Sequence, residues 1–486
     1  MSLLPLKITS SLNTEAEALL KWKNSLSSPL PFPSPLNSWS LTNHINLCNW
    51  DDVVCDTTNS TILEINLSNA NLSGTLTGLD IASFPNLTLL NLNRNRFHGS
   101  IPSTIGNLST LTFLDLENKL LEGTLPSELG QLRELQHVSF YNNNFNGTIP
   151  YQLTNLPKNN WNSKIPESIY GNLKRLEYLN LTNCGLEGKL SSNLSMLSNL
   201  KELRIARGEI PSSIGQLKEL VHLDLSVNFF NSKVPSELGL CTNLTFLSLA
   251  VNNLNGSLPF SLANLTKLSE LGLSDNSFSG EISASLISNW TELISLQLQN
   301  NSLTGKIGNI KAMTQLDLSA NHFSGPILST ICNLTNITVI NLFFNNLSGN
   351  IPVDIGNLTS LQIFDVDNNN LDGELPHSIS HLTSLIHFSV FTNNISGSIP
   401  GVFGKNSPSL TKVYLSNNSF SGELPSDMCS GLNLVVLAIN NNSFSGPLPN
   451  SLRNCSSLTR VRLDDNQFSG NMTEAFGVHP NLNFIS

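Results

Sequence analysis

Aliphatic residues recur at one fixed spacing over most of the chain. The repeating unit reads L-x-x-L-x-L-x-x-N-x-L-x-G-x-I-P-x-x-I-G-x-L, and residues 361–376 are a clear copy of its first part. The unit returns about every 24 residues, a period that indicates an array of stacked repeats. Its L-x-L segment alternates with period two, which predicts a short strand whose leucines are buried and whose intervening residues face solvent.

One asparagine follows this strand in most units. Its amide suits the backbone groups of a turn that no strand ladder reaches, so we expect stacked asparagines to form a ladder through the core. The glycine that comes next permits a tight bend, and the proline, which has no N–H to donate, closes a short second strand. The ladder positions are Asn95, Asn143, Asn228, Asn252, Asn276, Asn301, Asn321, Asn345, Asn369, Asn393, Asn418, Asn442 and Asn466.

These features predict an α/β repeat solenoid of the leucine-rich-repeat class. We expect a right-handed superhelix of the plant type, with a concave parallel β-sheet and short 3-10 or α segments on the convex side. One unit cannot bury its leucines alone, so the stability of each unit depends on its neighbours. Residues 61–486 hold about 18 units by this template.

Several units depart from the pattern. Ala70, Lys119 and Cys184 occupy the ladder position in place of asparagine. Three further units lack part of the pattern, and we expect locally distorted packing at these deletions. They lie at residues 156–161, 205–211 and 306–310.

Residues 13–60 lack the repeat and are interpreted as an N-terminal cap, which the exposed end of a solenoid requires. Within this segment, residues 14–26 predict a helix with an acidic first turn and one apolar face. The residues on that face are Ala18, Leu19, Trp22 and Leu26.

The two ends of the chain carry further expectations. Residues 1–12 resemble the tail of a secretion signal, although they lack a basic segment and a full apolar segment. Residues 482–486 open another strand, so we expect the array to be truncated before a C-terminal cap.

The cysteines indicate disulfides more than a metal site. Cys48 and Cys55 enclose a short loop, and we expect them to be bonded in an oxidising compartment. Cys429 and Cys455 lie about one period apart, which makes a bridge between stacked repeats plausible. We expect the remaining cysteines to be buried small apolar residues; they are Cys184, Cys241 and Cys332.

Composition narrows the possible functions. Charged residues make up only 12% of the chain and the net charge is -10, without a basic run that could neutralise a phosphate backbone. A nucleic-acid partner is therefore disfavoured. We also find no nucleophile, base and oxyanion set, no phosphate-binding loop and no metal-ligand spacing in the sequence, so we expect neither an enzyme nor a cofactor.

Three motifs together resemble the ectodomains of plant leucine-rich-repeat receptor-like kinases. They are Leu19-Leu-Lys-Trp-Lys, Cys48-Asn-Trp-x4-Cys55 and the N-x-L-S-G-x-I-P repeat. The resemblance implies a full-length parent with one membrane helix and a cytoplasmic Ser/Thr kinase, both outside this chain. It places the array on the extracellular face of the plasma membrane, or in the apoplast if the fragment is expressed alone.

The solvent-facing strand positions are candidates for ligand binding. Exposed aromatic residues on adjacent repeats are costly unless they meet a partner, which favours a ligand track over ordinary surface scatter. In the later units these positions include Phe343, Phe344, Asp365, Asp367, Ser389, Phe391, Lys412 and Tyr414.

Arg460 and Arg462 are the most specific candidates. Both project from one strand to the same face, and their guanidinium groups suit a carboxylate. They resemble the R-x-R motif with which several peptide-hormone receptor kinases hold the free C-terminal carboxylate of a secreted peptide. The alternative is a pair of solvated arginines that are balanced by Asp464 and Asp465.

Sequons for N-glycosylation are abundant, although G-N-L-T and N-N-L-S-G are themselves fragments of the repeat. Glycans on the convex side would leave the concave face for recognition. The candidate sites are Asn86, Asn107, Asn146, Asn180, Asn193, Asn243, Asn264, Asn289, Asn333, Asn357, Asn394 and Asn471.

Together these features favour a receptor ectodomain that binds a secreted peptide or protein and, in the full-length parent, recruits a leucine-rich-repeat co-receptor kinase. Two alternatives remain. One is a cell-wall protein that inhibits an enzyme and binds a large folded partner without an R-x-R pair. The other is a nonfunctional receptor fragment, as the internal deletions suggest.

Overall fold

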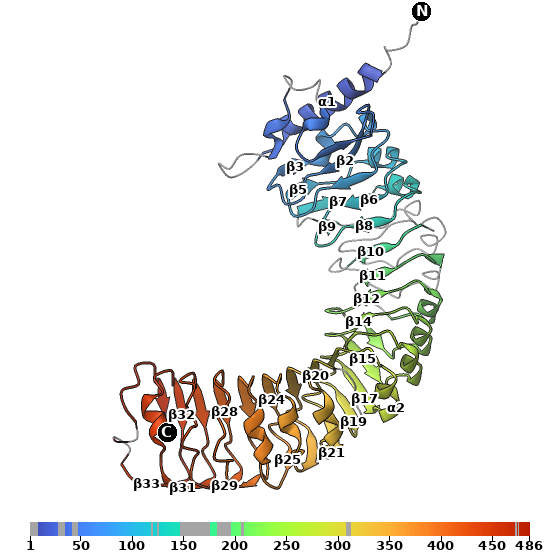
Figure 1. Cartoon of the computed structure of the whole chain (residues 1–486). Coiled ribbons are helices and arrows are strands. Elements are labelled where there is room, and N and C mark those ends of the chain that lie inside the picture. The colour runs from blue at the N-terminus through green and yellow to red at the C-terminus, as the bar shows by residue number, and fades with distance from the viewer. Residues whose placement is uncertain are drawn as a thin grey trace, which may run out of the picture. The chain divides into compact units, whose positions relative to one another are not determined.

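The computed structural model of the protein describes residues 8–27, 35–40, 47–117, 120–123, 126–145, 175–181, 196–205, 209–307, 313–471, 474 and 476–486. The chain divides into two compact units, Met1–Leu244 and Thr245–Ser486. In each unit, a strand of a main sheet, a short second strand and a helical segment follow one another repeatedly (Figure 1). No helix among the described residues has the length and apolar character needed to cross a membrane.

The main sheet of the first unit is parallel except at one edge. There, β1 runs antiparallel to β2, with Val53 opposite Ile65. Its strands are β1 (Val53–Cys55), β2 (Ile62–Asn66), β4 (Leu89–Asn91), β6 (Phe113–Asp115), β8 (His137–Ser139), β10 (Tyr178–Leu181), β11 (Glu202–Ile205) and β12 (His222–Asp224).

The main sheet of the second unit is parallel throughout. In β24, Phe364 is buried between Ile363 and Asp365, which are partly exposed, as the period-two pattern predicts. Its strands are β14 (Phe246–Ser248), β16 (Glu270–Gly272), β18 (Ser295–Gln297), β20 (Gln315–Asp317), β22 (Val339–Asn341), β24 (Ile363–Asp365), β26 (His387–Ser389), β28 (Lys412–Tyr414), β30 (Val436–Ala438), β32 (Arg460–Arg462) and β34 (Phe484–Ile485).

Short second strands follow the ladder positions. In the first unit they are β3 (Ser73–Thr75), β5 (Arg96–Gly99), β7 (Leu120–Gly123), β9 (Asn144–Phe145) and β13 (Asn231–Ser232). In the second unit they are β15 (Asn253–Gly256), β17 (Ser277–Glu281), β19 (Ser302–Gly305), β21 (His322–Gly325), β23 (Asn346–Gly349), β25 (Asn370–Leu371), β27 (Ser396–Gly397), β29 (Ser419–Gly422), β31 (Ser443–Pro447) and β33 (Gln467–Ser469).

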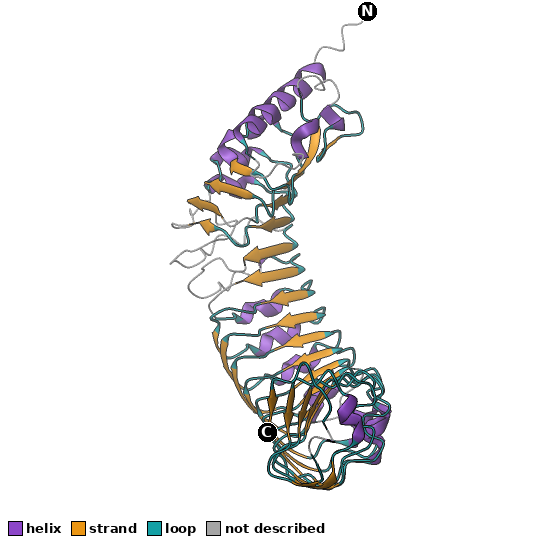
Figure 2. Ribbon diagram, turned by 90° about the vertical axis from the view of Figure 1, so that its left-hand side faces the viewer, coloured by secondary structure: helices purple, strands orange, loops and turns teal. Residues whose placement is uncertain are grey.

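Helical segments return the chain on the side away from the main sheets (Figure 2). Most are single 3-10 turns that begin after a proline, which has no N–H to leave unpaired. In the first unit they are η3 (Leu76–Gly78), η4 (Ile81–Ser83), η5 (Ser103–Asn107), η6 (Ser127–Gln131), η10 (Ser212–Gln216) and η11 (Ser236–Leu240). In the second they are η12 (Phe260–Asn264), α2 (Ala284–Ser288), η13 (Ser329–Asn333), η14 (Ile355–Asn357), η15 (His377–His381) and η16 (Asn450–Asn454).

The predicted asparagine ladder is present. Asn369 is typical: its Oδ1 accepts the N–H of Leu347 at 3.0 Å, and its Nδ2 donates to the carbonyls of Leu342, Val366 and Asp367 at 3.0 to 3.1 Å. The carbonyl of Val366 also accepts from Nδ2 of Asn393, one repeat later. Consecutive asparagines therefore share acceptors, which joins the repeats through polar contacts inside an apolar core.

The N-terminal cap contains the predicted helix, but its limits differ from the prediction. Helix α1 spans Ile8–Ser25, so Glu15 and Glu17 lie in its interior and its first turn carries no acidic residue. Ala18, Leu19 and Trp22 are buried as expected. Leu26 follows the end of the helix and is half-buried. A second short helix of the cap is η1 (Pro35–Ser38).

Helix α1 also buries one charged residue, Glu15, whose carboxylate is hydrogen-bonded. It accepts hydrogen bonds from Thr61 Oγ1 at 2.6 Å and from the N–H of Ile62 at 3.1 Å. Burial raises the pKa of Glu15, while these two bonds act in the opposite direction. The helix is thus attached to the start of β2 by specific polar contacts.

The three short units leave the main-sheet register intact. His137 lies opposite Tyr178, Glu202 opposite His222, and Ser295 opposite Gln315. The expected distortion is therefore absent from these strands. The asparagine ladder is also continuous across a short unit. Nδ2 of Asn321 donates to Leu298 O, 23 residues earlier, whereas Nδ2 of Asn345 makes the equivalent bond to Leu318 O, 27 residues earlier. Residues 156–161, 206–208 and 308–310 lie outside the described residues, as do Lys119 and Cys184.

Candidate functional site

The main sheet of the second unit carries a pocket on its solvent face, which we call the sheet-face pocket. It has a volume of about 420 Å³, and its walls come from strands β24, β26, β28, β30 and β32 and from residues just after them. The lining residues are Asp365, Asp367, His387, Ser389, Phe391, Tyr414, Ser416, Ala438, Arg460 and Arg462.

Parallel pairing places these residues in ordered rows that run across the strands. One row starts at a carboxylate and ends at a guanidinium group, with a hydroxyl and an aromatic ring between them. Its members, in order, are Asp365, Ser389, Tyr414, Ala438 and Arg462. The pocket therefore has an acidic end and a basic end on one continuous sheet.

At the acidic end, two carboxylates of one repeat lie close together. Asp365 Oδ2 lies 3.2 Å from His387 Nε2, and Asp365 Oδ1 accepts the N–H of Asp367 at 3.2 Å. The side-chain carboxylate of Asp367 accepts a hydrogen bond only from Asn368 Nδ2, at 3.3 Å, among the described residues. Burial and the nearby charge of Asp365 raise the pKa of Asp367 to about 6.

The middle of the pocket is aromatic. The Tyr414 ring lies 5.4 Å from the His387 ring, between centroids. Burial raises the pKa of the Tyr414 hydroxyl; the charge of Arg460 acts against this shift and that of Asp365 adds to it. Tyr414 therefore lies within electrostatic range of both ends of the pocket.

At the basic end, the positive charges of the two arginines are only partly balanced by acidic side chains. Arg460 packs its guanidinium over the Phe484 ring, 4.7 Å from the centroid, and Arg462 lies 3.5 Å from Asp464. The Nε of Arg462 is buried without an acceptor in the part of the chain that the structure describes. A buried donor of this kind normally has a partner. An external acceptor could meet the exposed part of the Arg462 side chain, which is 36% exposed.

The sequence and the fold are similar to those of known proteins. The model of the leucine rich repeat N-terminal domain matches residues 12–56. The leucine rich repeat model matches residues 86–108, 134–156, 175–197, 312–334, 336–358, 360–382, 409–430 and 433–455. The plant peptide hormone receptor RGFR1, solved in complex with RGF2, is 30% identical with a TM-score of 0.74; the alignment covers 90% of this chain and 75% of that receptor.

The chain belongs to the plant leucine-rich-repeat receptor family. The ectodomain of the Arabidopsis receptor kinase HAESA, in complex with the peptide hormone IDA and the co-receptor SERK1, is 29% identical with a TM-score of 0.79 and is covered to 89%. MDIS1-interacting receptor like kinase 2 of Arabidopsis thaliana is 38% identical over 96 residues, 20% of this chain. The matched segment spans only 9% of that receptor kinase.

Of the ten residues named above as candidates for ligand binding, seven line the sheet-face pocket. Phe343, Phe344 and Lys412 do not line the sheet-face pocket. Phe344 is 56% exposed and lies in the turn after β22, with a φ of 52°. Its ring packs edge-on against Phe343, with centroids 5.9 Å apart. Whether any of these residues contacts a ligand stays a prediction.

Three lining residues were not named as candidates: His387, Ser416 and Ala438. Ala438 occupies the same strand position as Ser389, two repeats later, but its side chain is small and apolar. His387 precedes the buried Phe388, in the row that leads to Arg460. His387 could have been predicted from the sequence by considering both residues that flank each buried strand position.

Both expected disulfides of this receptor ectodomain are present. Cys48 and Cys55 are bonded across their short loop, with Cα atoms 5.5 Å apart. Cys429 and Cys455 join adjacent repeats, with Cα atoms 6.1 Å apart. Cys241 and Cys332 are buried and free, as expected. No group of three or more metal-ligating side chains occurs among the described residues.

Most described sequon asparagines lie away from the sheet-face pocket. Asn107, Asn264, Asn333 and Asn357 end 3-10 turns on the opposite side and are exposed. Asn289 follows α2 and is also exposed. Asn180 differs, because it lies within main-sheet strand β10. The others have exposed or half-buried side chains, except where they lie outside the described residues; they are Asn86, Asn243, Asn394, Asn471, and the undescribed Asn146 and Asn193.

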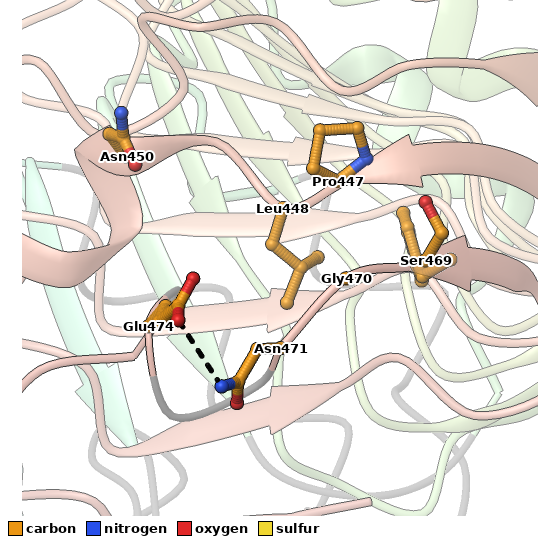
Figure 3. Close-up of a pocket in the computed structure, with 8 residues that line it drawn as sticks. Pro447, Leu448, Asn450, Ser469, Gly470, Asn471 and Glu474 are labelled. Atoms are coloured by element: carbon orange, nitrogen blue, oxygen red, sulfur yellow. Dashed lines mark hydrogen bonds between the residues drawn. The ribbon is translucent and has the colours of Figure 1, made fainter.

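A second, smaller pocket of about 220 Å³ lies beside β31 and β33 (Figure 3). Asn471 borders it and donates from Nδ2 to Glu474 Oε1 at 3.4 Å. Because Asn471 lines this pocket, a glycan on its sequon would lie beside it, so we favour the sheet-face pocket as the binding site.

Removing the unfavourable charge of Asp367 tests the electrostatics of the acidic end. The pKa of the Asp367 carboxyl is 3.8 by its ordinary value and about 6 in the folded protein. The folded protein therefore loses stability as the pH rises through this range, because the carboxyl must ionise in an unfavourable site. We expect Asp367→Asn to stabilise the protein at pH 7.5 by about 1 kcal/mol after solvent screening, or about 2 °C in Tm, and to have no effect at pH 3.5.

The matched control is Asp372→Asn, which removes an exposed carboxylate of the same repeat. Thermal melts of the three proteins at both pH values measure the difference. Equal melting temperatures of the wild type and Asp367→Asn at pH 7.5 would show that the charge is well compensated.

Proposed function

We propose that the sheet-face pocket binds the C-terminal end of a secreted peptide, whose carboxylate is held by Arg460 and Arg462. The observation that carries this proposal is that Arg460 and Arg462 line one pocket, while the partly exposed Arg462 side chain has only Asp464, at 3.5 Å, as a counter-charge among the described residues. Arg460 and Arg462 lie two residues apart on one strand, about 6.5 to 7 Å apart at the backbone, so their forks can converge on one carboxylate.

The alternative of two solvated arginines is supported less well. Arg462 meets Asp464 at only 3.5 Å, and Asp464 also accepts a hydrogen bond from Ser486 Oγ. That hydrogen bond is the main cause of the lowered pKa of Asp464. The carboxylate of Asp464 is thus shared, which leaves donor capacity on Arg462 for a ligand.

The solved relatives named above support a receptor role. The plant peptide hormone receptor RGFR1 was solved in complex with RGF2, and HAESA in complex with the peptide hormone IDA and the co-receptor SERK1. By analogy we propose that the full-length parent lies at the plasma membrane with this array outside the cell, and that ligand binding recruits a co-receptor kinase. Glycans on the exposed asparagines opposite the main sheet would leave the pocket accessible.

The proposal is tested with two peptide pools, because it depends on a terminal carboxylate. Randomised dodecapeptides with a free C-terminal carboxylate and the same pool with a C-terminal amide are passed over immobilised protein. We expect the free-acid pool to be retained preferentially, and Arg460→Ala/Arg462→Ala to lower this retention at least tenfold.

Arg453→Ala is the control, since Arg453 lies on η16 and is exposed outside the pocket. Equal retention of both pools, or retention unchanged in the double variant, would overturn the proposal. Selective retention of a large folded wall protein that is independent of both arginines would favour the inhibitor alternative.

A further inference from the structure

We infer that the acidic end of the sheet-face pocket is a second binding point of the peptide, at which Asp365 and Asp367 hold a lysine or arginine side chain about six residues before the C-terminal carboxylate. This inference rests on the proposed function and deepens it. It names the ligand class as a peptide with a cation and a carboxylate at a fixed separation.

The first step is that the negative charges of Asp365 and Asp367 are not fully balanced by nearby cations. Among the Lys, Arg and His side chains in the described part of the chain, only His387 lies within 4 Å of either carboxylate, and it contacts Asp365. Asp367 has no ion-pair partner there. Two adjacent carboxylates in a partly buried site repel each other, so an external cation would lower the free energy of the pocket.

The second step is the hydroxyl of Ser389, an observation independent of the acidic pair. Ser389 lines the pocket between Asp365 and Tyr414, yet it is only 2% exposed and its Oγ makes no hydrogen bond to any described residue. A buried hydroxyl without a partner is uncommon. It therefore indicates that a polar ligand group passes over this point of the sheet.

The third step is the separation of the two ends. Asp365 and Arg462 belong to the same row and lie four strands apart. Neighbouring strands are about 4.8 Å apart, so the row spans about 19 Å. An extended peptide advances about 3.3 Å per residue, which places the cation about six residues before the terminal carboxylate.

The fourth step is direction. The acidic residues precede the arginines along the array, so a peptide with its carboxylate at Arg462 runs from β24 toward β32. The aromatic rings of Phe391 and Tyr414 line the pocket between the two ends and offer apolar contact to the intervening residues. The reversed orientation would place the cation beside Arg460 and Arg462, where like charges repel.

The experiment uses free-acid dodecapeptide pools in which one lysine is fixed at a single position and the other residues are randomised without cations. Eight pools place the lysine from three to ten residues before the C-terminus. We expect the wild-type protein to retain best the pools with lysine roughly five to seven residues before the carboxylate, at least fivefold above the others.

Asp365→Asn/Asp367→Asn should flatten this profile while the preference for free-acid over amide pools persists. Asp317→Asn is the matched control, because Asp317 lies in the same row two repeats earlier, outside the pocket. A charge-reversed variant, Asp365→Lys/Asp367→Lys, should instead prefer pools with glutamate at the same positions. A protein that had failed to fold would show no such preference.

The outcomes separate the two proposals. A flat lysine profile on the wild type, with the free-acid preference intact, would overturn the inference and leave the proposed function standing. A profile unchanged in both aspartate variants would also overturn it. If the wild type shows no free-acid preference, both proposals fail.

Discussion

Replacing Asn369 by leucine is expected to lower the free energy of unfolding of the second unit by about 3 kcal/mol, or about 8 °C in Tm. The side chains have similar volumes, so the loss is polar in origin. The N–H of Leu347 has Asn369 Oδ1 as its acceptor, and Leu347 is fully buried, so this donor would be left unpaired. An unpaired buried N–H costs about 1 to 3 kcal/mol.

The three carbonyls that Asn369 serves suffer less, because each keeps another donor. Leu342 O also accepts from Asn345, Val366 O from Asn393, and Asp367 O from the N–H of Phe344. Losing Asn369 therefore costs little free energy at these three acceptors. The expected loss comes mainly from the N–H of Leu347, which would have no acceptor.

Asn370→Leu is the matched control, since Asn370 is exposed and donates only to Asn346 among the described side chains. We expect a change within about 0.5 kcal/mol. Thermal and denaturant melts compare the two variants. A Tm for Asn369→Leu within 1 or 2 °C of the wild type, roughly the size of a surface effect, would contradict the ladder's structural role.

Replacing Trp22 by alanine is expected to detach the N-terminal cap. The Trp22 side chain is fully buried, its indole N–H donates to Thr75 O at 3.0 Å, and its ring stacks on Phe97 with centroids 5.7 Å apart. Deleting a buried tryptophan side chain costs about 3 to 5 kcal/mol. We expect hydrogen exchange in β2 and β5 to accelerate at least a hundredfold.

Two further variants separate the contributions of the indole. Trp22→Phe keeps most of the apolar area but loses the hydrogen bond, so we expect a loss of about 1 kcal/mol. Lys21→Ala alters the exposed side of the same helix and should leave exchange unchanged. Unaltered protection of β2 and β5 in Trp22→Ala would mean that the first repeats are stable without the cap.

The repeat pattern predicted much of the fold because each position has a local physical role. Alternation in L-x-L places Phe364 inside and Asp365 outside without any knowledge of distant contacts. The same rule placed Asp365, Tyr414 and Arg462 on one face. Parallel register then aligns them, because equivalent strand positions of successive repeats pair even where the repeats differ in length.

Other features depend on three-dimensional context. The pattern could not show that Phe344 lies in a turn outside the pocket, because its frame position is the left-handed residue that precedes each ladder asparagine. It also could not show that α1 begins at Ile8, since residues before Thr14 carry no strong apolar period. The deletions leave the strand register intact, which the sequence alone did not reveal.

The antiparallel β1 also bears on how the molecule behaves in concentrated solution. A parallel edge strand would present the same hydrogen-bonding pattern that every repeat offers its successor, and a second copy could add to it end to end. Because β1 is short, reversed and fixed by the Cys48–Cys55 disulfide, it interrupts that pattern. The cap thus discourages filament growth through the N-terminal edge of the sheet.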